Sequence, residues 1–129
     1  MNRLTKNGIN YIPAIIVTII IFVLSALSSG TIRTFNLSDL FALDKLGHFL
    51  AYLALSFLYY FGYVRSKKRN PNRNELIWMI LLCSLYGILL EFCQLYFFSS
   101  RCFEVLDMIA NTLGIICGVV FGIIMIKLK

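Results

Sequence analysis

The chain has 129 residues, of which 60% are hydrophobic and only 14% are charged, and its mean hydropathy is +0.83. This is too little charge to cover the surface of a soluble domain, so the composition favours a single domain, residues 1–129, surrounded mostly by lipid. The formal net charge of +6 does not indicate nucleic-acid binding, because the basic residues lie in short segments between long apolar stretches. We therefore expect no nucleic-acid partner.

Four apolar stretches are each long enough to cross a bilayer, which takes about 20 residues of helix. The predicted fold is all-α, an integral membrane four-helix bundle, because an open strand in lipid would leave its backbone unpaired. The first stretch is longer than the apolar region of a signal peptide, about 7–15 residues, so we predict an uncleaved helix despite the preceding Arg3 and Lys6. The predicted spans are 9–28, 46–64, 76–98 and 106–126.

The basic residues predict the orientation of these spans. Lysine and arginine gather in cytoplasmic loops, so the side with more of them is the cytoplasmic one. Both ends of the chain and the connector between the second and third spans hold nine of the 12: Arg3, Lys6, Arg65, Lys67, Lys68, Arg69, Arg73, Lys127 and Lys129. The other connectors hold Arg33, Lys45 and Arg101. Both termini are thus predicted to be cytoplasmic, and connector 29–43 to lie outside, with residues 36–43 as a short helix at the interface.

Polar side chains recur at helical spacing near the predicted outer ends of three spans. Ionisable groups within a membrane are costly, so each is a candidate functional residue. The second span opens with Asp44, Lys45, His48 and Tyr52, the third ends with Glu91 and Gln94, and the fourth is preceded and opened by Arg101, Glu104, Asp107 and Asn111. Because the three polar faces agree in depth, we predict that they form one outward-facing site.

A catalytic role is predicted for His48, Glu91 and Asp107. At the start of a helix the positive dipole disfavours the imidazolium, which favours a neutral His48 as general base, with a desolvated Glu91 as acid. Substrate binding is assigned to Asp44, Lys45, Tyr52, Gln94, Arg101 and Asn111, where the basic pair suits a phosphate or carboxylate. No cofactor is expected. A metal site of His48, Glu91 and Asp107 is chemically allowed, but spacing alone does not select it, and no metal ligand is predicted.

Several of these residues also have structural interpretations. Asp44 suits an N-cap, and Tyr52 suits an aromatic belt at the membrane interface. Glu91 could pair with Arg101 or accept hydrogen bonds from Gln94 and Asn111. The small-residue series that follows Asn111 predicts close packing of the last helix against a neighbour: Gly114, Gly118 and Gly122.

Three blocks of residues together resemble the VanZ-like family of small bacterial membrane proteins, which is named after a teicoplanin-resistance protein. They are D-K-x-x-H-F-x-x-Y from Asp44 to Tyr52, G-x-x-x-E-x-x-Q from Gly87 to Gln94, and R-x-x-E-x-x-D-x-x-x-N-x-x-G-x-x-x-G from Arg101 to Gly118. The blocks occur in order and at the family's spacing. Glu104 departs from the family, where Asp or a small polar residue is more usual. The resemblance implies a role in the bacterial cell envelope, including lowered sensitivity to glycopeptide antibiotics for some members.

The leading functional hypothesis is a site that binds or modifies a membrane lipid or lipid-linked envelope precursor, in a multi-pass protein of the bacterial cytoplasmic membrane. The alternative is a non-enzymatic scaffold or a transporter for an amphipathic anion. A transporter favours polar groups near the midplane, whereas the cytoplasmic halves of these spans are nearly all apolar. A scaffold has no need of a buried Glu91.

Overall fold

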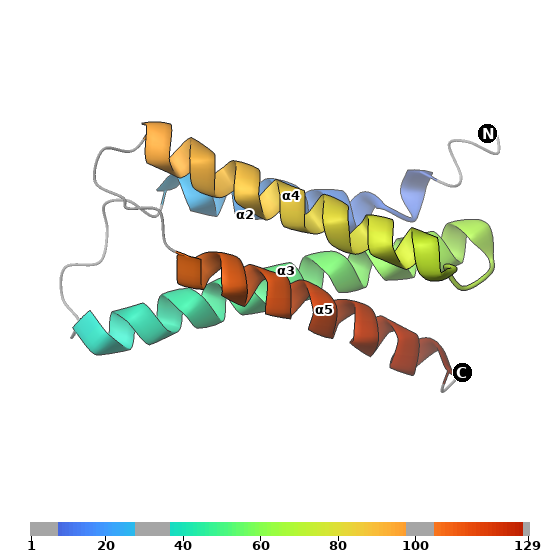
Figure 1. Ribbon diagram of the computed structural model, residues 1–129. Coiled ribbons are helices and arrows are strands. Elements are labelled where there is room, and N and C mark those ends of the chain that lie inside the picture. Colours follow the sequence, from blue (N-terminus) through green and yellow to red (C-terminus); the bar gives the residue numbers. More distant parts are fainter. Residues whose placement is uncertain (1–7, 28–36, 98–104, 128–129) are drawn as a thin grey trace.

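The computed structural model describes residues 8–27, 37–97 and 105–127, and within these ranges it contains four helices and no strand. The helices are α2 (Ile12–Leu27), α3 (Leu37–Lys67), α4 (Arg73–Phe97) and α5 (Val105–Lys127). Successive helices run in opposite directions, so the start of α2 and the end of α5 lie at the same end of the bundle (Figure 1). The predicted all-α architecture of four helices is confirmed.

Two of these helices, α4 and α5, are long and apolar enough to cross a membrane, judged by length and composition. They correspond closely to the predicted spans 76–98 and 106–126. The shorter α2 has 16 residues and is also strongly apolar. Large hydrophobic side chains are exposed along all four helices, among them Ile19, Leu50, Leu82 and Val120.

The second of the four helices, α3, is longer than predicted. The expected span 46–64 lies inside it, and residues 37–43, which we predicted to form a separate short helix in an outer connector, belong to α3 itself. Between Leu37 and Leu46 the sequence has no glycine or proline to interrupt the helix. The polar residues between Leu37 and Leu46 interrupt the apolar run of the sequence, but they do not interrupt the helix.

The longer α3 also corrects two expectations that depended on a helix start near residue 46. Asp44 is not an N-cap, because it lies about two turns inside α3. His48 lies about three turns from the first residue of the helix, beyond the first turn in which the dipole acts. The helix dipole therefore does not act on the His48 ring, and its neighbours on α3 and α5 form its environment.

The glycines of α5 pack directly on α3, the most extensive contact between two helices in the described chain. A Cβ atom at Gly114 would overlap the carbonyl oxygen of Phe49, and one at Gly118 would overlap the carbonyl oxygen of Leu53 and the Ser56 hydroxyl. At Gly122 it would lie 2.6 Å from the ring of Tyr60. The predicted role of this series in close helix packing is confirmed.

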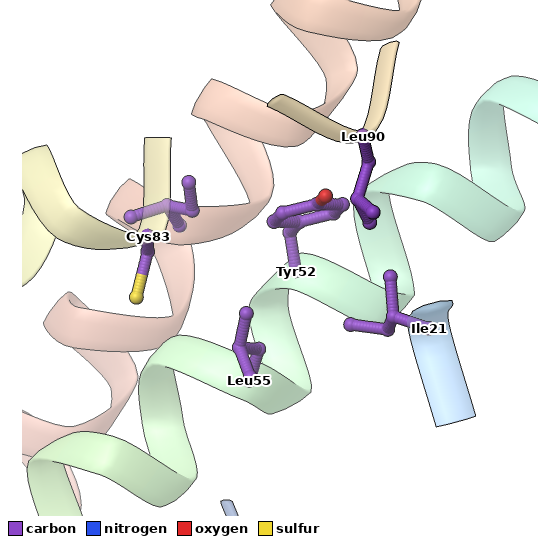
Figure 2. Close-up of a cluster of buried hydrophobic side chains, with 6 residues drawn as sticks. Ile21, Tyr52, Leu55, Cys83 and Leu90 are labelled. Carbon is purple, nitrogen blue, oxygen red and sulfur yellow. The ribbon is translucent and has the colours of Figure 1, made fainter. Parts of the chain in front are cut away.

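Hydrogen bonds and a small core attach α2 and α4 to this pair. The Tyr86 hydroxyl of α4 donates to the carbonyl oxygen of Thr18 in α2 at 2.7 Å. Figure 2 shows Tyr52 of α3 pointing toward Leu90 of α4, with Ile21 of α2 below Leu90. Tyr52 is almost fully buried, so its ring belongs to the core and not to an exposed aromatic belt.

The connector between α3 and α4 is held by Glu75. Its carboxylate accepts the backbone N–H of Asn72 at 2.7 Å, and its own N–H donates to the Asn72 side chain at 2.9 Å, which is a capping box. Arg69 donates to both carboxylate oxygens at 2.8 and 2.6 Å, and the Tyr63 hydroxyl donates to one of them at 2.5 Å. Lys68, with a φ of 53°, ends α3 in the left-handed conformation.

We predict that Gly118→Ala destabilises the protein by about 1–3 kcal/mol, the usual cost of overfilling a packed contact. The new methyl group would meet a backbone carbonyl of α3, which cannot move without separating the helices. Gly47→Ala is the matched control, because a Cβ at this helical glycine meets no atom within 4 Å. The free energy of unfolding of each purified variant measures the difference, and equal stability of the two variants would contradict the packing role.

We predict that Glu75→Ala lowers the free energy of unfolding by about 1 kcal/mol, since the variant loses half of the capping box. The exposed Arg69 pair adds little beyond this. Glu75→Gln keeps an acceptor for the Asn72 N–H and should lose less. Thermal unfolding followed by circular dichroism tests this order, and a Glu75→Ala variant as stable as the wild type would show that the connector does not need the cap.

Candidate functional site

The buried polar side chains of the described chain contrast with its apolar exterior. Five are almost fully buried: Ser56, Glu91, Gln94, Asp107 and Asn111. Four of the five were predicted as site residues from the sequence. A soluble domain places apolar groups inside and charges outside. Here the carboxylic acids Glu91 and Asp107 are buried, whereas many large apolar side chains are exposed.

Two carboxylates, one ammonium and one imidazole form a cluster between α3 and α5. Lys45 Nζ forms an ion pair with Asp107 Oδ1 and lies 3.3 Å from Asp44 Oδ2. The second oxygen of each carboxylate faces the histidine, with Asp44 Oδ1 4.0 Å and Asp107 Oδ2 3.9 Å from His48 Nε2. The structure therefore brings together three predicted substrate-binding or catalytic residues from α3 and one from the first turn of α5.

Burial differs across this cluster. The Asp107 side chain is 6% exposed, whereas that of Asp44 is 39% exposed. Asp107 Oδ1 has no hydrogen-bond partner among the described residues and is held by its ion pair with Lys45. The cluster thus opens toward solvent at Asp44 and is closed at Asp107.

Asn111 fixes the orientation of the histidine ring. Its side-chain Oδ1 lies 3.1 Å from His48 Nδ1. A carbonyl oxygen can only accept a hydrogen bond, so Nδ1 carries the proton and donates it. The other ring nitrogen, Nε2, then faces Asp44 and Asp107. In the neutral ring Nε2 is an acceptor, available to a proton or a cation.

One turn deeper, Tyr52 and Asn111 meet Gly87 of α4. A Cβ at Gly87 would lie 3.2 Å from the Tyr52 hydroxyl and 3.3 Å from Asn111 Nδ2. A hollow of about 30 Å³ opens beside this point, lined by Ser84, Gly87, Ile88, Met108, Asn111 and Thr112. Glu91 lies one turn after Gly87 on α4, and His48 lies one turn before Tyr52 on α3. Because α3 and α4 run in opposite directions, Glu91 and His48 are both displaced toward the same end of the bundle. Glu91 is 4% exposed.

The remaining predicted residues are distributed as follows. Gln94 Nε2 donates to the hydroxyl and carbonyl oxygens of Ser25 in α2, at 2.6 and 3.1 Å, so it links two helices. Lys45, which we expected to bind phosphate, directs its ammonium at two carboxylates. Arg101 and Glu104 lie outside the described residues.

Sequence reasoning missed two residues that shape this region. Ser25 is the partner of Gln94, but a serine at the end of an apolar stretch gave no signal of that role. Ser56 is buried on α3 at the Gly118 contact and donates to the carbonyl oxygen of Leu53 at 3.2 Å. Its spacing of four from Tyr52 continues the polar face of Asp44 and His48, and that periodicity could have identified it.

The fold and the site define a class of small all-helical proteins with an apolar exterior and a buried cluster of ionisable groups at one end. The chain matches the VanZ/LLP1 family over residues 2–126, nearly its whole length, and therefore belongs to that family. The resemblance seen in the three sequence blocks is confirmed. No curated protein and no solved structure matches the chain.

Proposed function

We propose that this protein crosses the bacterial cytoplasmic membrane with four helices and uses an outward-facing polar cluster to bind or modify an envelope lipid or lipid-linked precursor. The observation that carries the proposal is the burial of Asp107, Asn111 and Glu91 near one end of a bundle whose surface is apolar. Ionisable groups in such a place are costly, and they are retained where a ligand or a reaction needs them. Membership of the VanZ/LLP1 family supports an envelope role.

The apolar exterior supports the membrane part of the proposal. Contiguous exposed apolar surface on a soluble monomer rarely exceeds a few hundred Å², whereas here it runs along α2, α4 and α5. The helices α4 and α5 have the length and composition of membrane spans. Lipid chains would cover these side chains in the way that a protein core covers them elsewhere.

The orientation follows from the basic connector. Arg65, Lys67, Lys68, Arg69 and Arg73 lie where α3 ends and α4 begins, and all five are exposed. The polar cluster lies toward the other end of the bundle, near the start of α3 and in the first turn of α5. With the basic connector in the cytoplasm, the cluster is near the outer leaflet, where headgroups of lipids and lipid-linked precursors are found.

The site is suited to a ligand with a polar headgroup. Asp44 gives it an opening to solvent, and Lys45, Asp107 and Asn111 offer charges and hydrogen bonds behind that opening. The small hollow beside Asn111 lies between α4 and α5 and adds space next to these polar groups. Lowered sensitivity to glycopeptide antibiotics such as teicoplanin is the phenotype in which we expect this function to appear.

Cysteine labelling tests the orientation. In a variant without the native cysteines, Asn70→Cys should react with a membrane-impermeant thiol reagent only after the cells are permeabilised. Asn36→Cys should react in intact cells. We expect this pattern because the basic residues are in excess at the end of the bundle that holds the Asn70 connector. Labelling of position 70 in intact cells would reverse the orientation and place the cluster in the cytoplasm.

Native mass spectrometry of the detergent-purified protein tests the ligand. We expect the wild type to retain a defined phospholipid or polyprenyl-phosphate species, and Glu91→Gln to lose about tenfold or more of it at normal membrane abundance. Loss of one charged group from a buried polar site costs on the order of 1–3 kcal/mol of binding. Glu75→Gln is the matched control, because it removes a carboxylate at the opposite end of the bundle.

Two results would count against the proposal. If the wild type carries only bulk lipid, the scaffold alternative is favoured, and the polar cluster then serves folding. If Glu91→Gln only lowers the amount of protein in the membrane, Glu91 is structural and has no part in a ligand site.

A further inference from the structure

Three potential ligand atoms converge at the open end of the polar cluster. One carboxylate oxygen of Asp44, one of Asp107 and Nε2 of His48 all lie within 4.8 Å of one another. The closest approaches to Nε2 are 3.9 Å from Asp107 Oδ2 and 4.0 Å from Asp44 Oδ1. These separations are too long for hydrogen bonds. We propose that Asp44, His48 and Asp107 form a binding site for a divalent transition-metal ion.

The contact between His48 Nδ1 and Asn111 Oδ1 is the second observation that points to a cation. Nδ1 donates its proton to Asn111 Oδ1, so in the neutral ring the lone pair of Nε2 is directed at two carboxylates. Lys45 compensates the far oxygen of each carboxylate, and a cation placed among the two near oxygens and Nε2 would bind all three. Histidine ligands of metals commonly donate their other N–H to an oxygen acceptor, which fixes the ring and raises its basicity. Asn111 occupies that position here.

Lys45 holds both carboxylates in the required orientation. Its ammonium contacts Oδ1 of Asp107 and Oδ2 of Asp44, which leaves the other oxygen of each directed at His48. With metal–ligand bonds of about 2.0–2.2 Å, neighbouring ligands lie about 3.0–3.5 Å apart. The two separations between Nε2 and the carboxylate oxygens, 3.9 and 4.0 Å, would therefore need to shorten by about 0.4–1.0 Å, which side-chain rotations can supply.

The donor set indicates the kind of ion. One imidazole nitrogen and two carboxylate oxygens suit Zn²⁺ or Mn²⁺, whereas Ca²⁺ and Mg²⁺ prefer oxygen ligands only. Three protein ligands leave coordination positions open, as in metal sites that bind a substrate or water. The opening at Asp44, whose side chain is 39% exposed, gives the ion a path from solvent.

The sequence had allowed a metal site with Glu91 in place of Asp44. The structure assigns the third ligand to α3, because Asp44 precedes His48 by one turn and presents its oxygen to the same ring nitrogen. With the ion bound, Nε2 no longer accepts a proton, so His48 acts as a ligand and not as a general base. Metal binding does not depend on the lipid proposal and can be measured without any lipid precursor.

Electron paramagnetic resonance of Mn²⁺ added to the full-length protein in detergent tests the site. We expect one bound Mn²⁺ per chain, with a nitrogen coupling from an imidazole ligand in the pulsed spectrum. The chain contains a single histidine, so this coupling can come only from His48. Zn²⁺ should displace the Mn²⁺, as its higher affinity for such ligands requires, and an equal concentration of Ca²⁺ should not.

Variants distinguish the site from adventitious binding. His48→Gln and Asp107→Asn should each weaken Mn²⁺ binding by about tenfold or more. Glu75→Gln, which removes a carboxylate at the other end of the bundle, should leave binding unchanged. Substoichiometric Mn²⁺, bound Mn²⁺ without nitrogen coupling, or binding that His48→Gln leaves unchanged would overturn the proposal. The wild-type nitrogen coupling decides the matter even if a variant fails to fold.

Discussion

The close approach of α5 to α3 through Gly114, Gly118 and Gly122 determines the rest of the structure. These glycines continue the same face of α5 that carries Asp107 and Asn111. When the glycines pack on the backbone of α3, the two polar residues are brought beside Lys45 and His48. A larger residue in the series would separate the helices and leave ionisable groups facing apolar surroundings, where they are costly. The packing of α5 on α3 therefore also assembles the polar cluster.

Much of this arrangement could be predicted from the sequence. Four apolar stretches predict four helices, and the 3–4 spacing of Asp107, Asn111 and Gly114 predicts which face of α5 is inside. The same spacing places Asp44, His48 and Tyr52 on one face of α3. These predictions succeed because they depend on helix geometry, which is the same in every context. The capping box of Asn72 and Glu75 also has a readable signature, a polar residue three positions before a glutamate.

The failures have a physical cause as well. Hydropathy detects where lipid could cover a helix, but it does not detect where a helix begins, so the first turns of α3 were assigned to a connector. That error produced the wrong N-cap role for Asp44 and the wrong dipole effect on His48. Side-chain contacts between helices could not be predicted from the sequence. The contacts of Ser25 with Gln94 and of Lys45 with Asp107 depend on how each whole helix is rotated about its axis and shifted along it. A single sequence carries no direct signal of either.

The attachment of the four helices to one another is uneven. The α3 and α5 pair is joined by backbone contact, whereas α2 and α4 are joined to their neighbours mostly through side chains such as Tyr86 and Gln94. Side-chain contacts of this kind can be rearranged at a small cost in free energy, but close contacts between two backbones cannot. A ligand that enters beside Asn111, between α4 and α5, would therefore displace α4 more readily than α3.

In the proposed membrane arrangement, the length of α3 relates the polar cluster to the thickness of the bilayer. From Lys67 to His48 the helix rises about 28 Å, close to the roughly 30 Å of a typical hydrocarbon core. If Arg65 and Lys67 remain at the inner headgroups, His48 and Asp44 reach the level of the outer headgroups in such a bilayer. A thicker bilayer would draw them below that level unless the membrane thinned around the protein. Access to the cluster would then vary with the lipid composition of the membrane that holds it.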